Sequence, residues 1–402
     1  MSEAQTYENL LSACRRGGSS VLTSTTELGA AAGAHASIAP AKFVSHSNPT
    51  FAFETRYIDG QAQTVALIDG KQSSSNRGEA ALAQSIRDAE PVASRIPRMR
   101  VQYEDRDFLC MELPHRAFDG HFRAATLEGR PATQTNVFQA LRNCTPADSR
   151  ALLETSPISL ALGAWDATRA KDQVRIRSSV TGEIIGVLAD QEAEGRDRYS
   201  LRGGARVDPV AMSVQLDGAS MERILADQEH DLSAKTVASL RSEINKAKKE
   251  PVSASSLGLG GIPPSLDALG GVACSRIIRS WVLSFASLRQ LRFGAGAEGD
   301  AACRTLLAAL DLAVVARAEE ELYLRANCDL VELSEPETKL DLRFGKSQPI
   351  DPITVDTADA LLERAMDEAE AKAGIRWQGQ TLEFIGNPAV LRGAVDESEE
   401  EA

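Results

Sequence analysis

A junction at which an apolar segment passes through a polar loop into a helix constrains this chain more than any other feature. It spans residues 64–82, TVALIDGKQSSSNRGEAAL. The apolar residues suit a buried strand over 64–69, and the Ser/Asn run at 73–76 suits a helix N-cap, so we expect a helix from about Arg77 to residue 90. Free backbone N–H groups and the helix dipole would then favour a phosphate. A cap without any ligand explains the same residues.

Composition indicates a globular protein with a sizeable core. Of its 402 residues, 43% are hydrophobic and 25% are charged, which is ordinary for such proteins. Two or three domains, or one domain with large insertions, fit this length. The N-terminus lacks the pattern of a secretory signal, and the longest apolar run, 306–316, is far shorter than the roughly 20 residues of a membrane span. We therefore expect a cytoplasmic protein.

Charge and cysteine spacing limit the function. The six cysteines form no CxxC pair, so we expect reduced thiols, no metal and no cofactor. A net charge of -13 argues against nucleic-acid binding, because free-standing binders are usually basic. Five acidic residues in the segment 394–402 supply part of this charge. The local field on one face matters more to a polyanion than the sum.

The order of patterns along the chain predicts an α+β or α/β fold. We expect an irregular N-terminal arm over 1–55, β-rich stretches at 158–165 and 174–188, and a helical region at 221–250. A Gly/Ser/Pro loop should follow at 251–264. Further predictions are an apolar helix at 303–321, a strand at 328–333, a charged helix at 356–373 and a disordered acidic tail.

The segment HRAFDGHFR offers three interpretations. His115 and Asp119 lie one helical turn apart and could form a metal site or an acid/base pair, but His121 points elsewhere and zinc needs at least three protein ligands. In a helix over 115–125, Arg116 and Arg123 would share a face and contact phosphates, with Asp119 orienting them. A set of surface salt bridges is the third interpretation.

Arginines further along the chain suit a nucleic-acid backbone. Arg175 and Arg177 would share one face of a strand, about 6.6–6.8 Å apart. Arg202 and Arg206 flank two glycines that allow close approach of a ligand, and a basic run at 246–249 adjoins a loop. Solvated surfaces account for all of these as well. No intact Walker loop, GxSxG or HExxH motif is present.

Six segments occur in an order that resembles a known family. The chain is similar to the backbone subunit of type I-G (formerly I-U) CRISPR effector complexes, a Cas-seven-type protein of the RAMP superfamily. The segments that carry this resemblance are IDGKQSSSNRGEAAL (68–82), LPHRAFDGHFRAATLEG (113–129), SPISLALGAWDAT (156–168), RIRSSVTGEIIGV (175–187), ARVDPV (205–210) and SWVLSFASLRQLRFG (280–294).

The resemblance implies a ferredoxin-like, RRM-type palm with a fingers-like subdomain and a thumb. We assign strand 64–69 and helix 77–90 to its first βα unit, and helix 303–321 with strand 328–333 to its last. The expected division is an arm at 1–55, a palm with insertions at 56–350 (fingers at about 95–225, thumb at about 230–265), a helix and strand at 351–393, and the tail at 394–402.

The resemblance also implies a non-catalytic protein that oligomerises along CRISPR RNA and presents it for pairing with target DNA. Implied partners are further copies in a head-to-tail filament, a fused Cas-five/Cas-six-type subunit, a large Cas-eight-like subunit and a recruited helicase-nuclease, with no membrane. Together with the chemistry above, it predicts RNA contacts from Lys71, Ser73, Ser74, Asn76, Arg77, His115, Arg116, Arg123, Arg175, Arg177 and Arg202.

Two alternatives remain at this level. Asp69 ends the first predicted strand, where type III relatives carry a target-cleaving aspartate, so a metal-dependent ribonuclease using Asp69 with His115 is one. A single carboxylate is not a two-metal nuclease site, and a capping or loop-orienting role explains Asp69 without catalysis. A protein-interaction scaffold that binds no nucleic acid is the other, favoured by the net charge.

Overall fold

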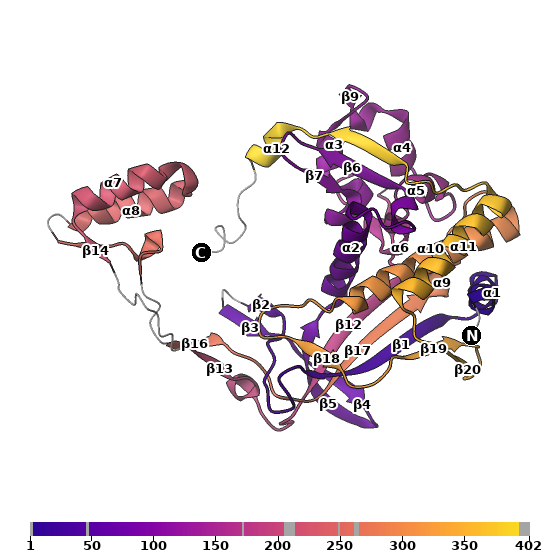
Figure 1. Cartoon of the computed structure of the whole chain (residues 1–402), viewed down its shortest axis with the longest axis horizontal. Coiled ribbons are helices and arrows are strands. Elements are labelled where there is room, and N and C mark those ends of the chain that lie inside the picture. The colour runs from indigo at the N-terminus through magenta and orange to yellow at the C-terminus, as the bar shows by residue number, and fades with distance from the viewer. Residues whose placement is uncertain are drawn as a thin grey trace. The chain divides into compact units, whose positions relative to one another are not determined.

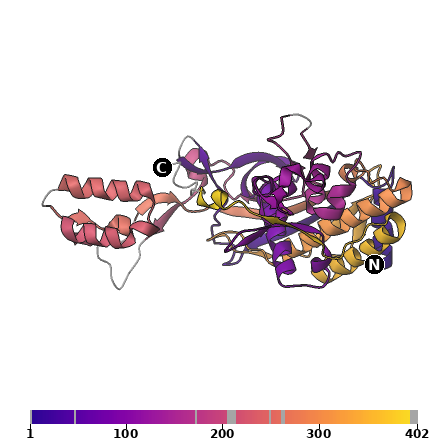
Figure 2. The same cartoon turned by 90° about the horizontal axis from the view of Figure 1, so that it is seen from above.

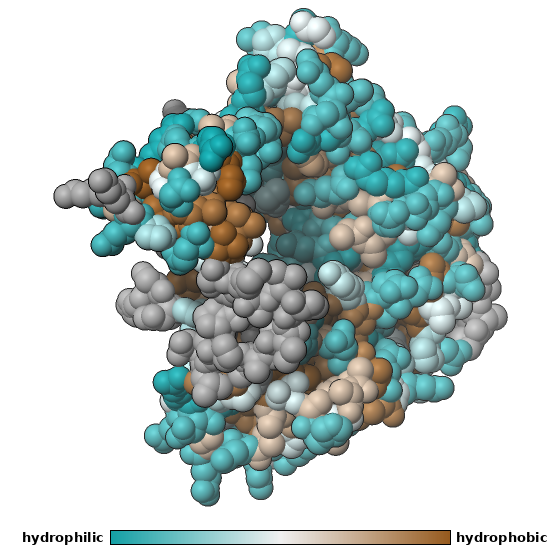
Figure 3. Space-filling model, turned by 60° about the vertical axis from the view of Figure 1, so that its left-hand side comes forward, coloured by the Kyte–Doolittle hydropathy of each residue, from teal (hydrophilic) through white to brown (hydrophobic). Residues whose placement is uncertain are grey.

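A computed structural model describes residues 3–45, 48–170, 173–204, 214–247, 250–260 and 265–393. The fold is α+β, with 41% helix and 26% strand. Two compact units are present, Met1–Arg198 with Val272–Ala402, and Tyr199–Gly271. Hydrophilic side chains predominate on the face seen in Figure 3, between smaller apolar patches.

The larger unit is built on an eight-stranded antiparallel sheet with the order β20-β19-β1-β17-β12-β5-β4, in which β18 also pairs with β1 (Figure 1). Its strands are β1 (Val21–Ala30), β4 (Phe53–Ile58), β5 (Gln61–Asp69), β12 (Val180–Leu188), β17 (Cys274–Ser284), β18 (Leu330–Glu332), β19 (Glu337–Asp341) and β20 (Ser347–Ile350).

The prediction of an irregular segment over 1–55 is wrong. This segment forms α1 (Glu3–Cys14), the ribbon of β2 (Lys42–Ser45) with β3 (Asn48–Phe51), and strand β1 in the middle of the sheet. β1 pairs with β17 from Val21↔Ser284 to Leu28↔Ile277. Its Ser and Thr residues suggested a loop, but β-branched Thr suits a strand and Thr26 is buried inside the sheet.

Helices cover one face of this sheet (Figure 1): α2 (Lys71–Arg87), α10 (Gly296–Glu320) and α11 (Val355–Ala373). α10 is buried from Gly299 to Ala318 because α2, α11 and α1 pack around it. The helices predicted at 303–321 and 356–373 are confirmed, although α10 begins seven residues earlier. None of the helices in the described ranges is long and apolar enough to cross a membrane.

A five-stranded sheet joins the C-terminal region to the middle of the chain. Its order is β7 (Asp107–Leu109), β6 (Arg98–Gln102), β21 (Thr381–Ile385), β8 (Thr126–Leu127) and β9 (Arg130–Pro131), and β21 runs parallel to β6. Phe384 in β21 packs against Phe122 and Phe138, with ring centroids 5.0 and 6.0 Å away. Distant segments therefore share one core.

Short elements complete this unit. The β-rich stretch predicted at 158–165 is wrong in its first half, because Pro157 precedes a helical turn, α6 (Ile158–Ala161). That at 174–188 is confirmed by β11 and β12. The remaining elements are α3 (Gly120–Ala124), α4 (Asn136–Arg142), α5 (Arg150–Thr155), α9 (Phe285–Leu288), α12 (Pro388–Arg392), β10 (Ala164–Trp165), β11 (Arg175–Ile176), η1 (Ala93–Arg95), η2 (Cys110–Glu112), η3 (Arg116–Phe118), η4 (Ala132–Gln134) and η5 (Gly195–Arg198).

The smaller unit has its own core, formed by Met221, Leu225, Val237 and Leu240. Its helices α7 (Gly218–Gln228) and α8 (Ala234–Ala247) lie side by side (Figure 2). The helical region predicted at 221–250 is thus two helices, and residues 248–249 lie outside the described ranges. The unit also contains β13 (Leu201–Gly204) paired with β16 (Ser265–Leu269), β14 (Gln215–Leu216) paired with β15 (Val252–Ser253), η6 (Glu229–Asp231) and η7 (Ser255–Leu257).

Asp311 is a carboxylic acid in the middle of α10 with no access to solvent. Its Oδ2 atom lies 2.6 Å from the Ser179 hydroxyl, which lies 2.9 Å from the Ala161 carbonyl oxygen. A hydroxyl has one hydrogen, so both contacts are made when Ser179 donates to the Ala161 carbonyl and accepts a hydrogen bond from the protonated carboxyl of Asp311. Burial raises the pKa of Asp311 well above its ordinary value.

Asp311→Asn should therefore stabilise the protein at neutral and higher pH. The unfolded chain ionises Asp311 near pH 4, whereas the fold keeps it protonated, so wild-type stability is lost as pH rises through the raised folded-state pKa. Each unit of pKa difference is worth about 1.4 kcal/mol. Urea unfolding from pH 5 to 8 should show a growing advantage of the variant. Asp367→Asn, at an exposed position, is the control, and parallel pH profiles for wild type and Asp311→Asn would contradict this account.

The contact of α2 with α10 requires a glycine. A Cβ atom at Gly78 would lie 2.5 Å from Cγ1 of the buried Val314. Gly78→Ala should lower the free energy of unfolding by about 1–3 kcal/mol through overpacking, despite its better helix propensity. In a Val314→Ala background the same substitution should cost at least about 1 kcal/mol less. Equal costs in the two backgrounds, measured by urea unfolding, would disprove the close contact.

Candidate functional site

A groove crosses the larger unit beside α2. Its widest part, about 930 Å³, lies between α2 and residues 111–116. It shares Pro114, Arg116, Leu162 and Ser178 with a second hollow of about 570 Å³. That hollow shares Arg175, Ile176 and Arg177 with a third, of about 350 Å³. Because each hollow shares walls with the next, we treat the three as one groove.

One wall of the groove is the N-terminal half of α2. The predicted helix start at Arg77 is wrong: Gly70 is the N-cap and Lys71 is the first helical residue. Residues 73–76 therefore lie in the first two turns. Lys71 and Asn76 are exposed and line the widest part, together with Ser75 and Glu79, whereas Ser73 does not line it.

Ser74 and Arg77 face the interior. Asp69, at the end of β5, is fully buried and accepts hydrogen bonds on Oδ2 from Ser74 Oγ at 2.8 Å and Arg77 Nη2 at 2.9 Å. Arg325 Nη2 lies 3.6 Å from its other oxygen. Arg77 also donates to the Ala318 carbonyl in α10. These groups hold the strand–helix junction together and lie outside the groove.

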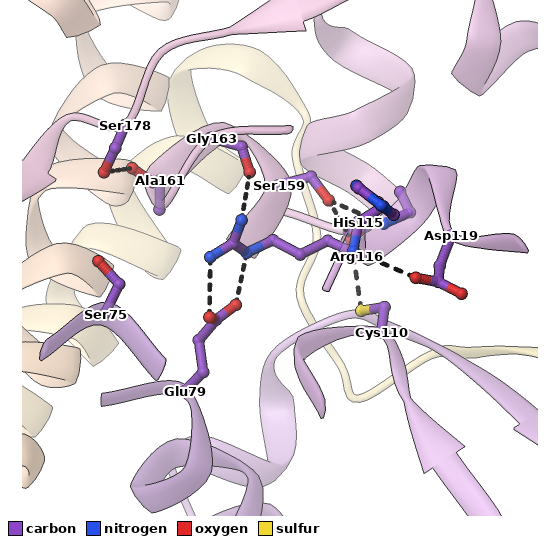
Figure 4. Close-up of polar contacts among 12 residues, drawn as sticks. Ser75, Glu79, Cys110, His115, Arg116, Asp119, Ser159, Ala161, Gly163 and Ser178 are labelled. Carbon is purple, nitrogen blue, oxygen red and sulfur yellow. Dashed lines mark hydrogen bonds and ion pairs between the residues drawn. The ribbon is translucent and has the colours of Figure 1, made fainter. Parts of the chain in front are cut away.

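Arg116 lines both the first and the second hollow. Figure 4 shows its guanidinium between Glu79 and Gly163. Arg116 makes two hydrogen bonds to the carboxylate of Glu79, one of them 2.8 Å long, and donates through Nη1 to the Gly163 carbonyl at 3.0 Å. Glu79 is buried, which raises its pKa even though the guanidinium opposes this shift. Arg116 has a φ of 49°, a strained backbone conformation for a side chain of this size.

The helix predicted over 115–125 is wrong. The chain forms η3 at Arg116–Phe118, breaks at Asp119, and resumes as α3, because the Asp119 carboxylate caps α3 by accepting from the His121 N–H. Arg116 and Arg123 therefore do not share a helix face. Arg123 is half-buried and does not line the groove. His115 is exposed and lines the second hollow.

Arg175 and Arg177 line the second and third hollows of the groove. The predicted alternation is confirmed, since both are exposed while Val174 and Ile176 are buried, although β11 is only two residues long. The Arg175 guanidinium carbon lies 4.5 Å from the ring centroid of Trp165. Among the described residues, the side chains of Lys71 and Arg177 have no hydrogen-bond or ion-pair partner, and the Arg175 side chain has no ion pair.

The side chain of Arg202, Arg206 and half of the basic run at 246–249 lie outside what the structure describes. Their predicted contacts stay predictions. Among the described residues no group of three His, Cys, Asp or Glu side chains could hold a metal ion. All six cysteines are free, and five of them are buried.

Sequence reasoning missed Glu79 and Trp165. Glu79 stands 37 positions before its partner Arg116, and nothing local marks the pair. Trp165 lies in the segment SPISLALGAWDAT, but its exposure on a short hairpin became visible only in the structure. Exposed aromatic residues beside unpaired cations suit a polyanionic ligand that also has flat rings.

The fold and this groove define an α+β protein with a groove lined by exposed cations. Residues 22–191 match the model of a family described as CRISPR-associated protein GSU0053 (Cas_GSU0053). Through this region the chain is similar to a family of CRISPR-associated proteins, and this similarity favours a role in CRISPR immunity. The matched region runs from β1 to just beyond β12 and includes Lys71, His115, Trp165, Arg175 and Arg177. Curated proteins gave no match to the chain.

The Glu79–Arg116 pair should be essential for stability. Removing one member of a buried pair leaves an uncompensated charge, so Glu79→Ala should lower the free energy of unfolding by about 3 kcal/mol or more. Arg87 and Glu112, also beside α2, form a more exposed pair at 2.7 Å. Glu112→Ala should therefore cost about 1 kcal/mol or less. Equal losses on thermal or urea unfolding would show that Arg116 is not held as described.

Proposed function

We propose that this protein is a non-catalytic backbone subunit of a type I-G CRISPR effector complex, a Cas-seven-type protein. In this role it oligomerises along CRISPR RNA, binds the RNA backbone in the groove, and presents the bases for pairing with target DNA. The single observation that carries the proposal is the set of unpaired groove cations inside the region that matches a CRISPR-associated family.

The strand order supports the ferredoxin-like palm that this role implies. β19-β1-β17-β12 is the order 4-1-3-2 of that fold, with α2 between the first and second strands and α10 between the third and fourth. In this assignment the first palm strand is β1, not the strand at 64–69, and the last is β19, not the strand at 328–333. β5, β4 and β20 extend the sheet, and Tyr199–Gly271 supplies the thumb.

The groove narrows the set of proposed RNA contacts. Lys71, Asn76, His115, Arg175 and Arg177 line it and are exposed, so they can reach phosphates. Arg116 is paired with Glu79 and positions the groove wall. Ser74 and Arg77 instead hold the β5–α2 junction. Phosphate contacts of this kind read no sequence, which suits a subunit whose specificity comes from base pairing.

Assembly accounts for the net charge of -13. Head-to-tail contacts between identical subunits generate a filament, and an acidic outer surface is compatible with cations confined to one groove. The further partners are a fused Cas-five/Cas-six-type subunit, a large Cas-eight-like subunit and a helicase-nuclease that cuts the DNA. The similarity of residues 22–191 to a CRISPR-associated family favours interactions with other Cas proteins.

The proposal assigns no catalysis to Asp69. Its carboxylate has no exposed surface and is engaged by Ser74 and Arg77, with Arg325 close by. A nuclease aspartate must bind a metal ion and reach the RNA. The buried position therefore favours a structural role over the ribonuclease alternative.

Co-expression with a CRISPR array and the RNA-processing subunit tests the proposal. Wild-type protein should purify in a high-mass, multi-copy particle that contains discrete guide-length RNA. Lys71→Glu/Arg175→Glu/Arg177→Glu should reduce the retained RNA by about tenfold or more, because three phosphate contacts become repulsive. Sequencing and quantifying the RNA in the high-mass fraction provides the measurement.

The control is a triple reversal of equal charge, Arg16→Glu/Lys346→Glu/Arg392→Glu, at exposed positions outside the groove. It should retain the RNA. An RNA-free wild-type monomer would support the protein-interaction scaffold instead. RNA cleavage with magnesium that disappears in Asp69→Ala would support the ribonuclease.

A further inference from the structure

Trp165 differs from the other tryptophans in its exposure. Its relative accessibility is 42%, against 4% for Trp281 and 2% for Trp377. The exposed indole lines the second hollow of the groove with His115, Arg175 and Arg177. A large apolar ring that remains exposed within a cationic groove is a candidate ligand contact, because burying such a ring inside the fold would otherwise favour stability.

The hairpin that carries Trp165 is held from both ends. Trp165 pairs with Arg175 across β10 and β11, and the Asp166 N–H donates to the Val174 carbonyl at 3.0 Å. At the other end, Gly163 adopts a φ of 84° and its carbonyl accepts from Arg116. A Cβ at Gly163 would lie 2.8 Å from backbone atoms, so the turn requires glycine. The indole is therefore presented on a preformed support.

Arg175 keeps its charge available beside the ring. Asp166, which follows Trp165 on the hairpin, is buried and bound to Arg142 at 2.8 Å, so its carboxylate is engaged elsewhere. The guanidinium lies over the indole at 4.5 Å, an arrangement that leaves its remaining N–H groups free to bind an anion. A flat π-surface and a bound cation are thus fixed next to each other.

We propose that Trp165 and Arg175 form a stacking subsite for one unpaired nucleobase, with Arg175, Arg177 and His115 bound to the flanking phosphates. The subsite rests on the proposed RNA-binding function and specifies its ligand as single-stranded RNA. A base inside a duplex has no free face to offer the indole. Every unpaired base has an aromatic face that can stack on the indole, so the subsite tolerates any sequence.

Intrinsic fluorescence of the full-length protein tests this subsite directly, because Trp165 is its exposed tryptophan. Titration with a short single-stranded RNA should quench the emission of the wild type. In Trp165→Phe, which retains the buried Trp281 and Trp377, the quenching should be lost. Trp165→Leu removes the π-surface and should bind the RNA about 5- to 150-fold more weakly, with an unchanged melting temperature.

An RNA of the same length whose bases are replaced by abasic sites separates stacking from phosphate binding. It should bind the wild type more weakly than the normal RNA does, and it should bind wild type and Trp165→Leu equally. Equal binding of normal and abasic RNA to the wild type would overturn the subsite and leave the proposed function intact. Binding of neither RNA would overturn the proposed function itself.

Discussion

The buried carboxylate of Asp69 determines how α2 leaves the main sheet. Ser74 and Arg77 both bind its Oδ2 atom, and Arg77 continues to the Ala318 carbonyl of α10. The Oδ2 atom of Asp69 thus connects the end of β5 to the first two turns of α2 and, through Arg77, to α10. The orientation of α2 that results turns Lys71, Asn76 and Glu79 toward the groove. A fully buried carboxylate is tolerated here because guanidinium and hydroxyl donors replace its hydration.

Glu79 connects α2 to the hairpin that carries Trp165 and Arg175. It holds Arg116, which holds the carbonyl of Gly163, and Gly163 begins the hairpin that presents Trp165 and Arg175. Glu79 and Gly163 are more than eighty residues apart in the chain. The position of one relative to the other depends on the Arg116 guanidinium, which binds both Glu79 and the Gly163 carbonyl. A lysine at this position would lack the planar fork of donors that these two contacts need.

Local patterns in the sequence predict the elements whose stability is local. Periodicity and the Thr354 and Gly374 caps define α11, and the alternation around Arg175 and Arg177 is visible in the sequence alone. β1 escaped prediction because its Ser and Thr residues are stabilised by pairing with β17, more than two hundred and fifty residues away. The start of α2 was not predicted correctly because the Ser74 hydroxyl binds Asp69 in the tertiary structure and does not cap the helix. The contacts of Glu79 with Arg116 and of Trp165 with Arg175 likewise form only in the tertiary structure, so no local pattern predicts them.

The arginines of the groove divide into two kinds by their partners. Arg77 and Arg116 are bound to the buried carboxylates of Asp69 and Glu79, and removing either arginine would take away a charged partner of a buried carboxylate. Arg175 and Arg177 lie in the open without an ion pair, so a phosphate meets a charge that the protein has not already neutralised. An acidic protein can therefore bind a polyanion. Its buried ion pairs contribute little to the electrostatic field at the surface, whereas exposed, unpaired cations contribute most of the positive field there. Pairing within the fold, more than net charge, therefore decides which face of this molecule suits nucleic acid.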